Sequence, residues 1–168
     1  MKRCFAVRWS KIRHKLENEY LAESLRGHIR YFATSYNKYP DNEGRASILL
    51  DGKEIIEGSY CEQWSKAHLL PKDENYRLRI SDEFPIMDDV ALQFGQFDQR
   101  CLYRAFDEFD NQSIEKSLSS ENAIVRVFAL LDRRTGKRRL RTIKDTIHNE
   151  GEVFRTFFNI RATAEGIL

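Results

Sequence analysis

Two groups of carboxylates near the middle of the chain are of the residue types that perform acid–base or metal chemistry. One is the pair at 88–89, and the other contains Asp107 and Asp110, whose spacing gives neighbouring positions on a helix. Two carboxylates act as acid and base, or hold Mg²⁺, only when both point into one pocket. Phe106 and Phe109 supply the apolar face of the same stretch. We therefore expect these acids to face solvent or to pair with cations, and a hydrolase or transferase site at Asp107 and Asp110 is an alternative.

The histidines and cysteines do not occur at the spacings of metal sites. The three cysteines are far apart, and none of the four histidines has a second histidine four residues away. Structural zinc sites need closely spaced ligands of these types, so the sequence predicts no metal and no cofactor. A cysteine nucleophile would need a histidine brought to it by the fold, and buried, reduced thiols are the expectation. These residues are Cys4, Cys61, Cys101, His14, His28, His68 and His148.

A basic segment near the C-terminus is the sharpest chemical feature of the sequence. On a helix, Leu140, Ile143 and Ile147 share one side, and most of the cations fall on the opposite side. Guanidinium groups bind phosphates and carboxylates through paired hydrogen bonds. We call the predicted binding residues the basic surface, and they are Arg133, Arg134, Lys137, Arg138, Arg139, Arg141 and Lys144.

Charge is distributed unevenly along a chain whose formal net charge is only +2. Residues 1–20 carry a net +4, residues 81–121 a net −7 and residues 126–144 a net +7. The basic surface has a purely structural explanation if it is a solvated face or if it forms internal ion pairs with the acidic segment. Otherwise it binds a protein partner, or it binds nucleic acid in a salt-dependent manner. No helix-turn-helix or zinc-finger signature accompanies it.

The N-terminal half is predicted to contain a helix and a small antiparallel sheet. Apolar residues at helical spacing predict a helix over about residues 10–25, with Ser10 as its N-cap and Gly27 just beyond its end. Aromatic and β-branched residues over 28–36 predict a strand. Asp51-Gly52, flanked by apolar runs, is typical of a two-residue β-hairpin turn.

The C-terminal half is predicted to be helical from about Pro85, which suits a first helical turn. Asp98 is expected to cap a helix that contains Phe106. A shift of 29 residues aligns the apolar pattern of 124–131 with that of 153–160. This similarity resembles short HEAT-like helix pairs, although a stack of helices without repeats accounts for it equally well.

These elements predict an α+β fold in one compact domain over residues 1–168, with a helix-plus-sheet region at 9–84 and a helical region at 85–168. No apolar run approaches the roughly 20 residues of a membrane span, and the charges from Arg8 onward interrupt any secretion signal. We therefore expect a cytoplasmic protein with no membrane association. The sequence does not indicate an oligomeric state.

Several segments together resemble a family of small, uncharacterised bacterial proteins. They are Trp9-Ser10-Lys11-Ile12-Arg13, Gly44-Arg45-Ala46, Asp51-Gly52-Lys53-Glu54-Ile55, Phe94-Gly95-Gln96-Phe97-Asp98, Ser119-Ser120-Glu121-Asn122, and the stretch from Leu130 through Leu131-Asp132-Arg133-Arg134-Thr135-Gly136-Lys137-Arg138. The resemblance implies a bacterial cytoplasmic origin and carries over no catalytic or binding residue. Residues 1–8 precede it and are expected to be a variable extension.

The expected function is a non-enzymatic interaction with a macromolecule through the basic surface. A protein is the expected partner, and nucleic acid bound by the same face is the alternative. The expectation of no catalysis rests on the failure of any nucleophile, base and orienting group to assemble from sequence spacing.

Overall fold

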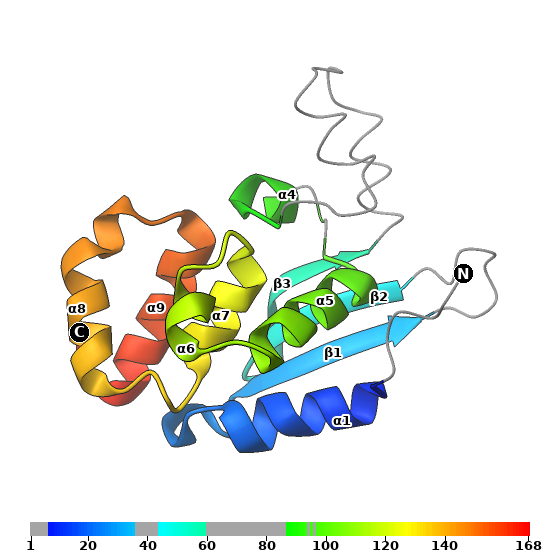
Figure 1. The fold of residues 1–168 in the computed structure, drawn as a ribbon, viewed down its shortest axis with the longest axis horizontal. Coiled ribbons are helices and arrows are strands. Elements are labelled where there is room, and N and C mark those ends of the chain that lie inside the picture. Colours follow the sequence, from blue (N-terminus) through cyan, green and yellow to red (C-terminus); the bar gives the residue numbers. More distant parts are fainter. Residues whose placement is uncertain (1–6, 36–43, 60–86, 94, 96) are drawn as a thin grey trace.

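The chain folds into a small antiparallel sheet packed against helices, with a helical C-terminal half (Figure 1), as the sequence predicts. A computed structural model describes residues 7–35, 44–59, 87–93, 95 and 97–168. The N-terminal half contains α1 (Trp9–His14), the π-helix η1 (Lys15–Tyr20), the 3₁₀ turn η2 (Glu23–Leu25), and the strands β1 (Ile29–Ser35), β2 (Gly44–Leu50) and β3 (Lys53–Ser59). The rest contains α4 (Asp89–Gln93), α5 (Gln99–Asp110), α6 (Ile114–Leu118), α7 (Ala123–Leu131), α8 (Lys137–Thr146), the 3₁₀ turn η3 (Ile147–Asn149) and α9 (Glu152–Glu165).

The sheet has the order β1-β2-β3 with antiparallel neighbours. Asp51 and Gly52 turn the chain between β2 and β3 with φ angles of 50° and 81°, as a type I′ hairpin turn requires. A register shift after Ile48 pairs Leu49 with Glu54. Because side chains alternate between faces along a strand, one face is apolar and the other carries charged side chains.

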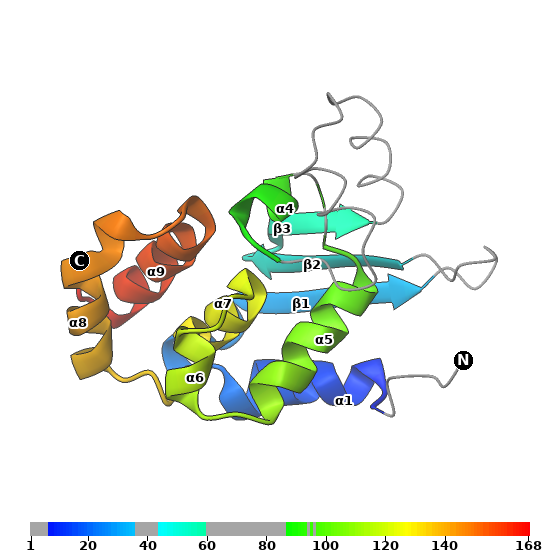
Figure 2. The same ribbon diagram turned by 45° about the horizontal axis from the view of Figure 1, so that its top comes forward.

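The core lies between the apolar face of the sheet and the helices α5 and α7. Tyr31 of β1 meets Phe128 of α7 edge to face at 5.6 Å between ring centroids, and Phe128 meets Phe109 of α5 at 5.7 Å. Such edge-to-face aromatic pairs add to the stability gained by burying apolar surface. Both views show α5 crossing this face of the sheet, with α1 along the β1 edge (Figures 1 and 2).

The first helix differs from its predicted bounds at both ends. Trp9 is already helical and stacks on Tyr103 at 6.1 Å, so Arg8, not Ser10, occupies the N-cap position. The α-helix continues as a π-helix and stops at Leu21, whose backbone is extended and bridges Asp132. This tertiary contact ends the helix before Gly27. Gly27 still adopts a positive φ of 85° ahead of β1.

The helices of the C-terminal half begin where polar side chains cap them. Asp98 accepts a hydrogen bond from the Cys101 amide at 2.9 Å, as predicted, and Asn122 accepts one from the Ile124 amide at 3.0 Å. Pro85 lies outside the described residues. Val90, in the helix that follows, is 40% exposed. The helix α4 has only five residues, and Ala91 and Leu92 are its buried side chains.

A buried arginine ties the C-terminal helices to the turn between α7 and α8. Arg161 of α9 is 3% exposed. It donates hydrogen bonds to the carbonyls of Leu131 and Thr135, and it forms an ion pair with Glu165 at 3.1 Å. Leu131 is the last residue of α7, where carbonyls have no intrahelical partner, and its carbonyl also accepts from the Ala22 amide at 3.0 Å. Arg161 thus joins α9 to the end of α7 and to the turn that follows it.

The 29-residue shift in the sequence places α7 on α9, and these two helices pack directly on each other. The helix α8 lies at the end of the molecule away from the sheet (Figures 1 and 2). The HEAT-like interpretation of these helices stays a prediction. Among the described residues, no helix combines the length and the apolar character needed to cross a bilayer.

Candidate functional site

Three members of the basic surface are exposed and hold no internal ion pair. Arg133 lies in the turn before α8, and Arg138 and Arg141 lie one turn apart on α8. Their guanidinium groups make no hydrogen bond or ion pair with any other residue that the structure describes. Leu140 is the buried side chain of α8, with Ile143 half-buried beside it. The helix therefore directs its cations outward, as its pattern predicts.

The other four members of the basic surface each have a partner. Arg134 binds Asp132 through two nitrogens at 2.7–3.1 Å and lies over the Tyr20 ring. Lys137 lies 3.8 Å from Glu165, and Arg139 lies 2.5 Å from Glu115. Lys144 donates to the carbonyl of Ile167 at 2.9 Å. Because Asp132 is fully buried, its bond to Arg134 fixes the turn ahead of α8.

The basic and acidic segments meet at only one ion pair within the described part of the chain, between Arg139 and Glu115. This pair is exposed on the Glu115 side, where the favourable energy of an ion pair is small. Ion pairing between the acidic and basic segments therefore compensates little of the charge on the basic surface.

The carboxylates at Asp107 and Asp110 have different surroundings. Asp110 accepts hydrogen bonds from Lys15 at 2.8–2.9 Å and from the Tyr20 hydroxyl at 2.5 Å. Burial opposes ionisation of Asp110, but these two donors outweigh it and lower the pKa of its carboxyl. Asp107 is exposed and contacts Asn111. One carboxylate is bound in a salt bridge while the other faces solvent, so the two do not converge on one site.

The pair at 88–89 caps helices. The Asp88 carboxylate accepts a hydrogen bond from the Ala91 amide of its own helix at 2.9 Å. The Asp89 carboxylate accepts one from the Val153 amide in the first turn of α9 at 3.2 Å. Negative charge at a helix N-terminus is favourable, and this placement gives the two acids a structural role.

The described histidines and cysteine do not gather into a cluster. His14 lies near Glu19, His28 contacts Asp51 at 2.7 Å, and His148 is exposed. Burial raises the pKa of the Cys101 thiol, which makes it a poor nucleophile. Cys4, Cys61 and His68 lie outside the described residues. Within the described ranges, no three His, Cys, Asp or Glu side chains are placed to hold a metal ion.

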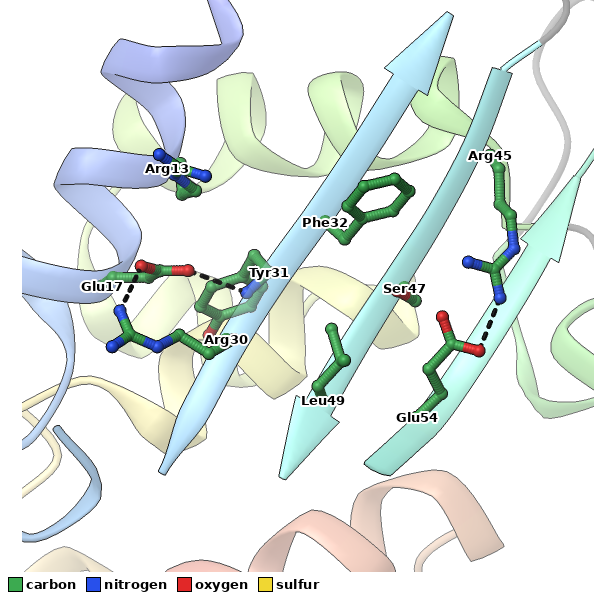
Figure 3. A pocket seen from close by; sticks show the side chains of 9 residues that line it. All are labelled: Arg13, Glu17, Arg30, Tyr31, Phe32, Arg45, Ser47, Leu49 and Glu54. Atoms are coloured by element: carbon green, nitrogen blue, oxygen red, sulfur yellow. Dashed lines mark hydrogen bonds and ion pairs between the residues drawn. The ribbon is translucent and has the colours of Figure 1, made fainter. Parts of the chain in front are cut away.

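A cavity lies on the charged face of the sheet, at residues that the sequence analysis did not select. Its volume is about 520 Å³, within the range of small-molecule sites. We call it the sheet cavity. Phe32 of β1 and Leu49 of β2 lie between its two sides, together with Ser47 (Figure 3). Phe32 is 41% exposed, so part of its ring is open to the cavity.

The two sides of the sheet cavity carry different charged groups. On the side of α1 and η1, Glu17 accepts a hydrogen bond from Arg30 at 2.9 Å, and Arg13 lies nearby (Figure 3). Arg13 is exposed, and it has no ion pair with any residue in the described part of the chain. On the opposite side, Arg45 binds Glu54 at 2.5 Å.

The Arg45–Glu54 pair fixes the charge on its side of the cavity. The hydrogen bond from Arg45 lowers the pKa of the Glu54 carboxyl from 4.5 to about 2, against the opposing effect of burial. Glu54 is therefore ionised at neutral pH. Arg45 also pairs with Glu57, so its charge is already compensated. Among the arginines that line the cavity, Arg13 is therefore the one without an ion-pair partner in the described part of the chain.

Ser47 is a polar residue in the sheet cavity with an unmet hydrogen bond. Its side chain is fully buried, and its Oγ forms no hydrogen bond of good geometry with the described residues. It lies close enough to Glu54 to contribute to the lowered pKa of that carboxyl. A buried hydroxyl without a hydrogen bond costs about 1–3 kcal/mol. Such a residue in a cavity marks a place for a polar ligand atom.

A comparison with protein families places this chain. The model of the SF0329 protein family matches residues 8–162, which is nearly the whole chain. The chain belongs to the SF0329 protein family. No curated protein and no solved structure matches it. The family match begins at Arg8, and the helices and strands named above lie within it or extend a few residues past its end.

Alternation within β1 is a sequence signal from which part of the sheet cavity could have been predicted. Ile29, Tyr31 and Ala33 are buried, so Arg30 and Phe32 must face the other side of the strand. A phenylalanine on the polar face of a strand, next to an arginine, is visible in the sequence alone. Arg13, which also lines the cavity, lies on α1, and no short-range sequence pattern connects it to β1.

Proposed function

We propose that the protein binds an acidic surface of a partner protein through the basic surface on α8. The observation that carries this proposal is a set of three exposed arginines that have no partner among the residues that the structure describes, Arg133, Arg138 and Arg141. Arginine pairs with carboxylates through two parallel hydrogen bonds and is enriched at protein interfaces. The position of α8 at one end of the molecule leaves its outer side open to a partner (Figure 2).

The pairing of the other cations favours a protein over nucleic acid as the partner. Arg134, Lys137, Arg139 and Lys144 already hold internal partners, which leaves few cations for a phosphate backbone. Nucleic-acid binding gains its affinity from neutralising many phosphates. Three arginines are few for that purpose, whereas a few arginines commonly anchor a protein interface.

The test is the capture of partners from a lysate of the organism that encodes the protein, with and without nuclease. Captured proteins are identified, purified and titrated against wild type and the double variant Arg138→Glu/Arg141→Glu. We expect an acidic protein whose binding survives nuclease and weakens at least about tenfold in the variant, because reversing two interface charges replaces attraction with repulsion.

A matched control reverses two charges on another helix. Arg8 and Lys11, at the start of α1, are exposed, and glutamate is well tolerated at a helix N-terminus. The variant Arg8→Glu/Lys11→Glu is expected to bind the partner as wild type does. Loss of all captured protein after nuclease treatment, with log-linear salt dependence of binding, would assign the basic surface to nucleic acid instead.

We also propose that the protein acts in a bacterial cytoplasm. The resemblance to small bacterial proteins supports this origin, and the free, buried thiol of Cys101 suits a reducing compartment. Fractionation of the source cells, with detection of the protein in each fraction, tests this location. Recovery from the medium or a membrane pellet would contradict it.

A further inference from the structure

The sheet cavity places an unpaired cation and an ionised carboxylate on opposite sides of an apolar surface. Arg13 stands on one side, and Glu54, held by Arg45, stands on the other (Figure 3). A ligand that matches both sides carries an anion at one end and N–H donors at the other. Amino acids without a donor in the side chain do not fit, because their carboxylate and ammonium groups are adjacent on one carbon atom. Most of those with such a donor lack the flat ring that the surface between the two sides suits.

The surface between these two sides suits a flat ring. Phe32 is exposed in the middle of β1, with Leu49 on the adjacent strand (Figure 3). Stacking on an exposed aromatic side chain is a common way for proteins to hold a nucleobase, and it tolerates any base. Arg45 lies over the Phe32 ring, with its guanidinium carbon 6.0 Å from the ring centroid, so a base stacks on the open face of the ring or on the guanidinium plane.

The buried Ser47 hydroxyl is an independent sign of a ligand. Its Oγ has no hydrogen bond within the described residues, although the side chain is fully buried. Ser47 lines the sheet cavity beside Glu54, where a ring nitrogen or ribose hydroxyl of a ligand would be the missing partner.

We propose that the sheet cavity binds a nucleoside phosphate, with its base on Phe32, its phosphate at Arg13 and an amino group of the base at Glu54. The cavity volume of about 520 Å³ accommodates a ligand of this size. Adenine, cytosine and guanine carry an exocyclic amino group that donates to a carboxylate. Uracil has no exocyclic amino group, and its single N3–H donor is flanked by two carbonyl oxygens that repel Glu54.

A nucleoside phosphate reaches this site as a free nucleotide or as part of a single strand. Both sources share the chemistry of base, sugar and phosphate, and titration of two probes distinguishes them. AMP represents the free nucleotide, and a short oligoadenylate represents the strand. A strand-binding site binds the oligomer much more tightly than AMP and loses affinity steeply with salt. A nucleotide site binds AMP at least as tightly as the oligomer.

Isothermal titration calorimetry with the full chain tests the proposal. We expect saturable binding of AMP or of the oligoadenylate, and UMP is expected to bind several-fold more weakly than AMP. Adenosine, which lacks the phosphate, is expected to bind about tenfold more weakly than AMP, the loss typical of one charge-assisted hydrogen bond. This comparison uses only wild-type protein, so it does not depend on any variant folding correctly.

Variants then assign the contacts. Arg13→Ala and Phe32→Thr are each expected to weaken binding about tenfold or more, while Phe32→Tyr keeps the ring and the affinity. Arg155→Ala is the matched control, because it removes an exposed arginine of α9 whose side chain has no partner among the described residues and which belongs neither to the sheet cavity nor to the basic surface. It is expected to leave nucleotide binding unchanged.

Three results would overturn the proposal. One is the failure of both AMP and the oligoadenylate to saturate the protein below about 10 mM. Another is equal binding of adenosine and AMP, because Arg13 would then contact no phosphate. The third is wild-type affinity in both Arg13→Ala and Phe32→Thr, with circular dichroism showing that the variants are folded.

Discussion

Glu17 accepts a hydrogen bond from the backbone amide of Tyr31 at 3.0 Å, and this bond closes the outer edge of β1. Edge strands present unpaired amides that invite pairing with other chains. In this protein a side chain from the π-helix η1 fills that role, and the same carboxylate also binds Arg30 at 2.9 Å. Glu17 is only 8% exposed. The π-helix η1 and the strand β1 thus together position Glu17 and Arg30 on one side of the sheet cavity.

Replacing Glu17 by alanine is expected to lower the free energy of unfolding by about 2 kcal/mol, because the Tyr31 amide loses its acceptor in a buried setting. Urea unfolding measures the change, and faster hydrogen exchange of the Tyr31 amide locates it. Glu19→Ala, two residues along the same helix and exposed, is the control and should change stability by less than about 0.5 kcal/mol. Equal effects of the two variants would show that the bond to Tyr31 contributes nothing.

Replacing Arg161 by methionine is expected to destabilise the protein by about 2–4 kcal/mol. The change leaves the Thr135 carbonyl without its buried donor, removes one of the two donors to the Leu131 carbonyl, and takes away the buried arginine partner of Glu165. Thermal or urea denaturation measures this loss. Arg155→Met changes an exposed arginine of the same helix and is expected to be nearly neutral. Wild-type stability of Arg161→Met would mean that packing of the methionine fully replaces these bonds.

Replacing Gly58 by alanine is expected to lower stability by about 1–3 kcal/mol, the usual range for overpacking. A Cβ at this position would overlap the backbone of Gly95, which cannot yield as a flexible side chain does. Gly136→Ala serves as the matched control, because a Cβ there meets nothing within 4 Å. Calorimetric melting of the two variants should therefore differ clearly, and similar melting temperatures would contradict the close approach of β3 and Gly95.

The pair between Arg45 and Glu54 predicts a specific dependence of stability on pH. The pKa of Glu54 falls from 4.5 to about 2 on folding. Its contribution is therefore present above the unfolded pKa and is lost as pH falls through the folded one. Because Glu54 is partly exposed, we expect this contribution to be about 1 kcal/mol. The variant Glu54→Gln should be less stable than wild type by that amount at neutral pH.

Urea unfolding at several pH values measures this difference, which should shrink towards zero as pH approaches about 2. Glu23→Gln, an exposed glutamate in η2, controls for the loss of one negative charge. A constant difference between Glu54→Gln and wild type across this range would refute the assignment.

Short-range features of the fold were predictable from the sequence because neighbouring residues determine them. The turn at Asp51-Gly52 needs two positive φ angles, and this dipeptide tolerates them. Asp98 caps α5 through an amide three residues away. The outward direction of the cations on α8 likewise follows from helical periodicity, with Leu140 on the opposite side. Each of these features depends on contacts within a few residues along the chain.

Tertiary structure alone decided where the first helix ends and which charged groups remain free. The bridge from Leu21 to Asp132 ends the helix six residues before Gly27, and no local signal marks that contact. Long-range partners occupy Arg139 and Lys137, whereas Arg138 between them has none among the described residues. The sheet cavity brings α1, β1, β2 and β3 together. An ion pair or a cavity depends on the distance between side chains in space, and a single sequence records only their separation along the chain.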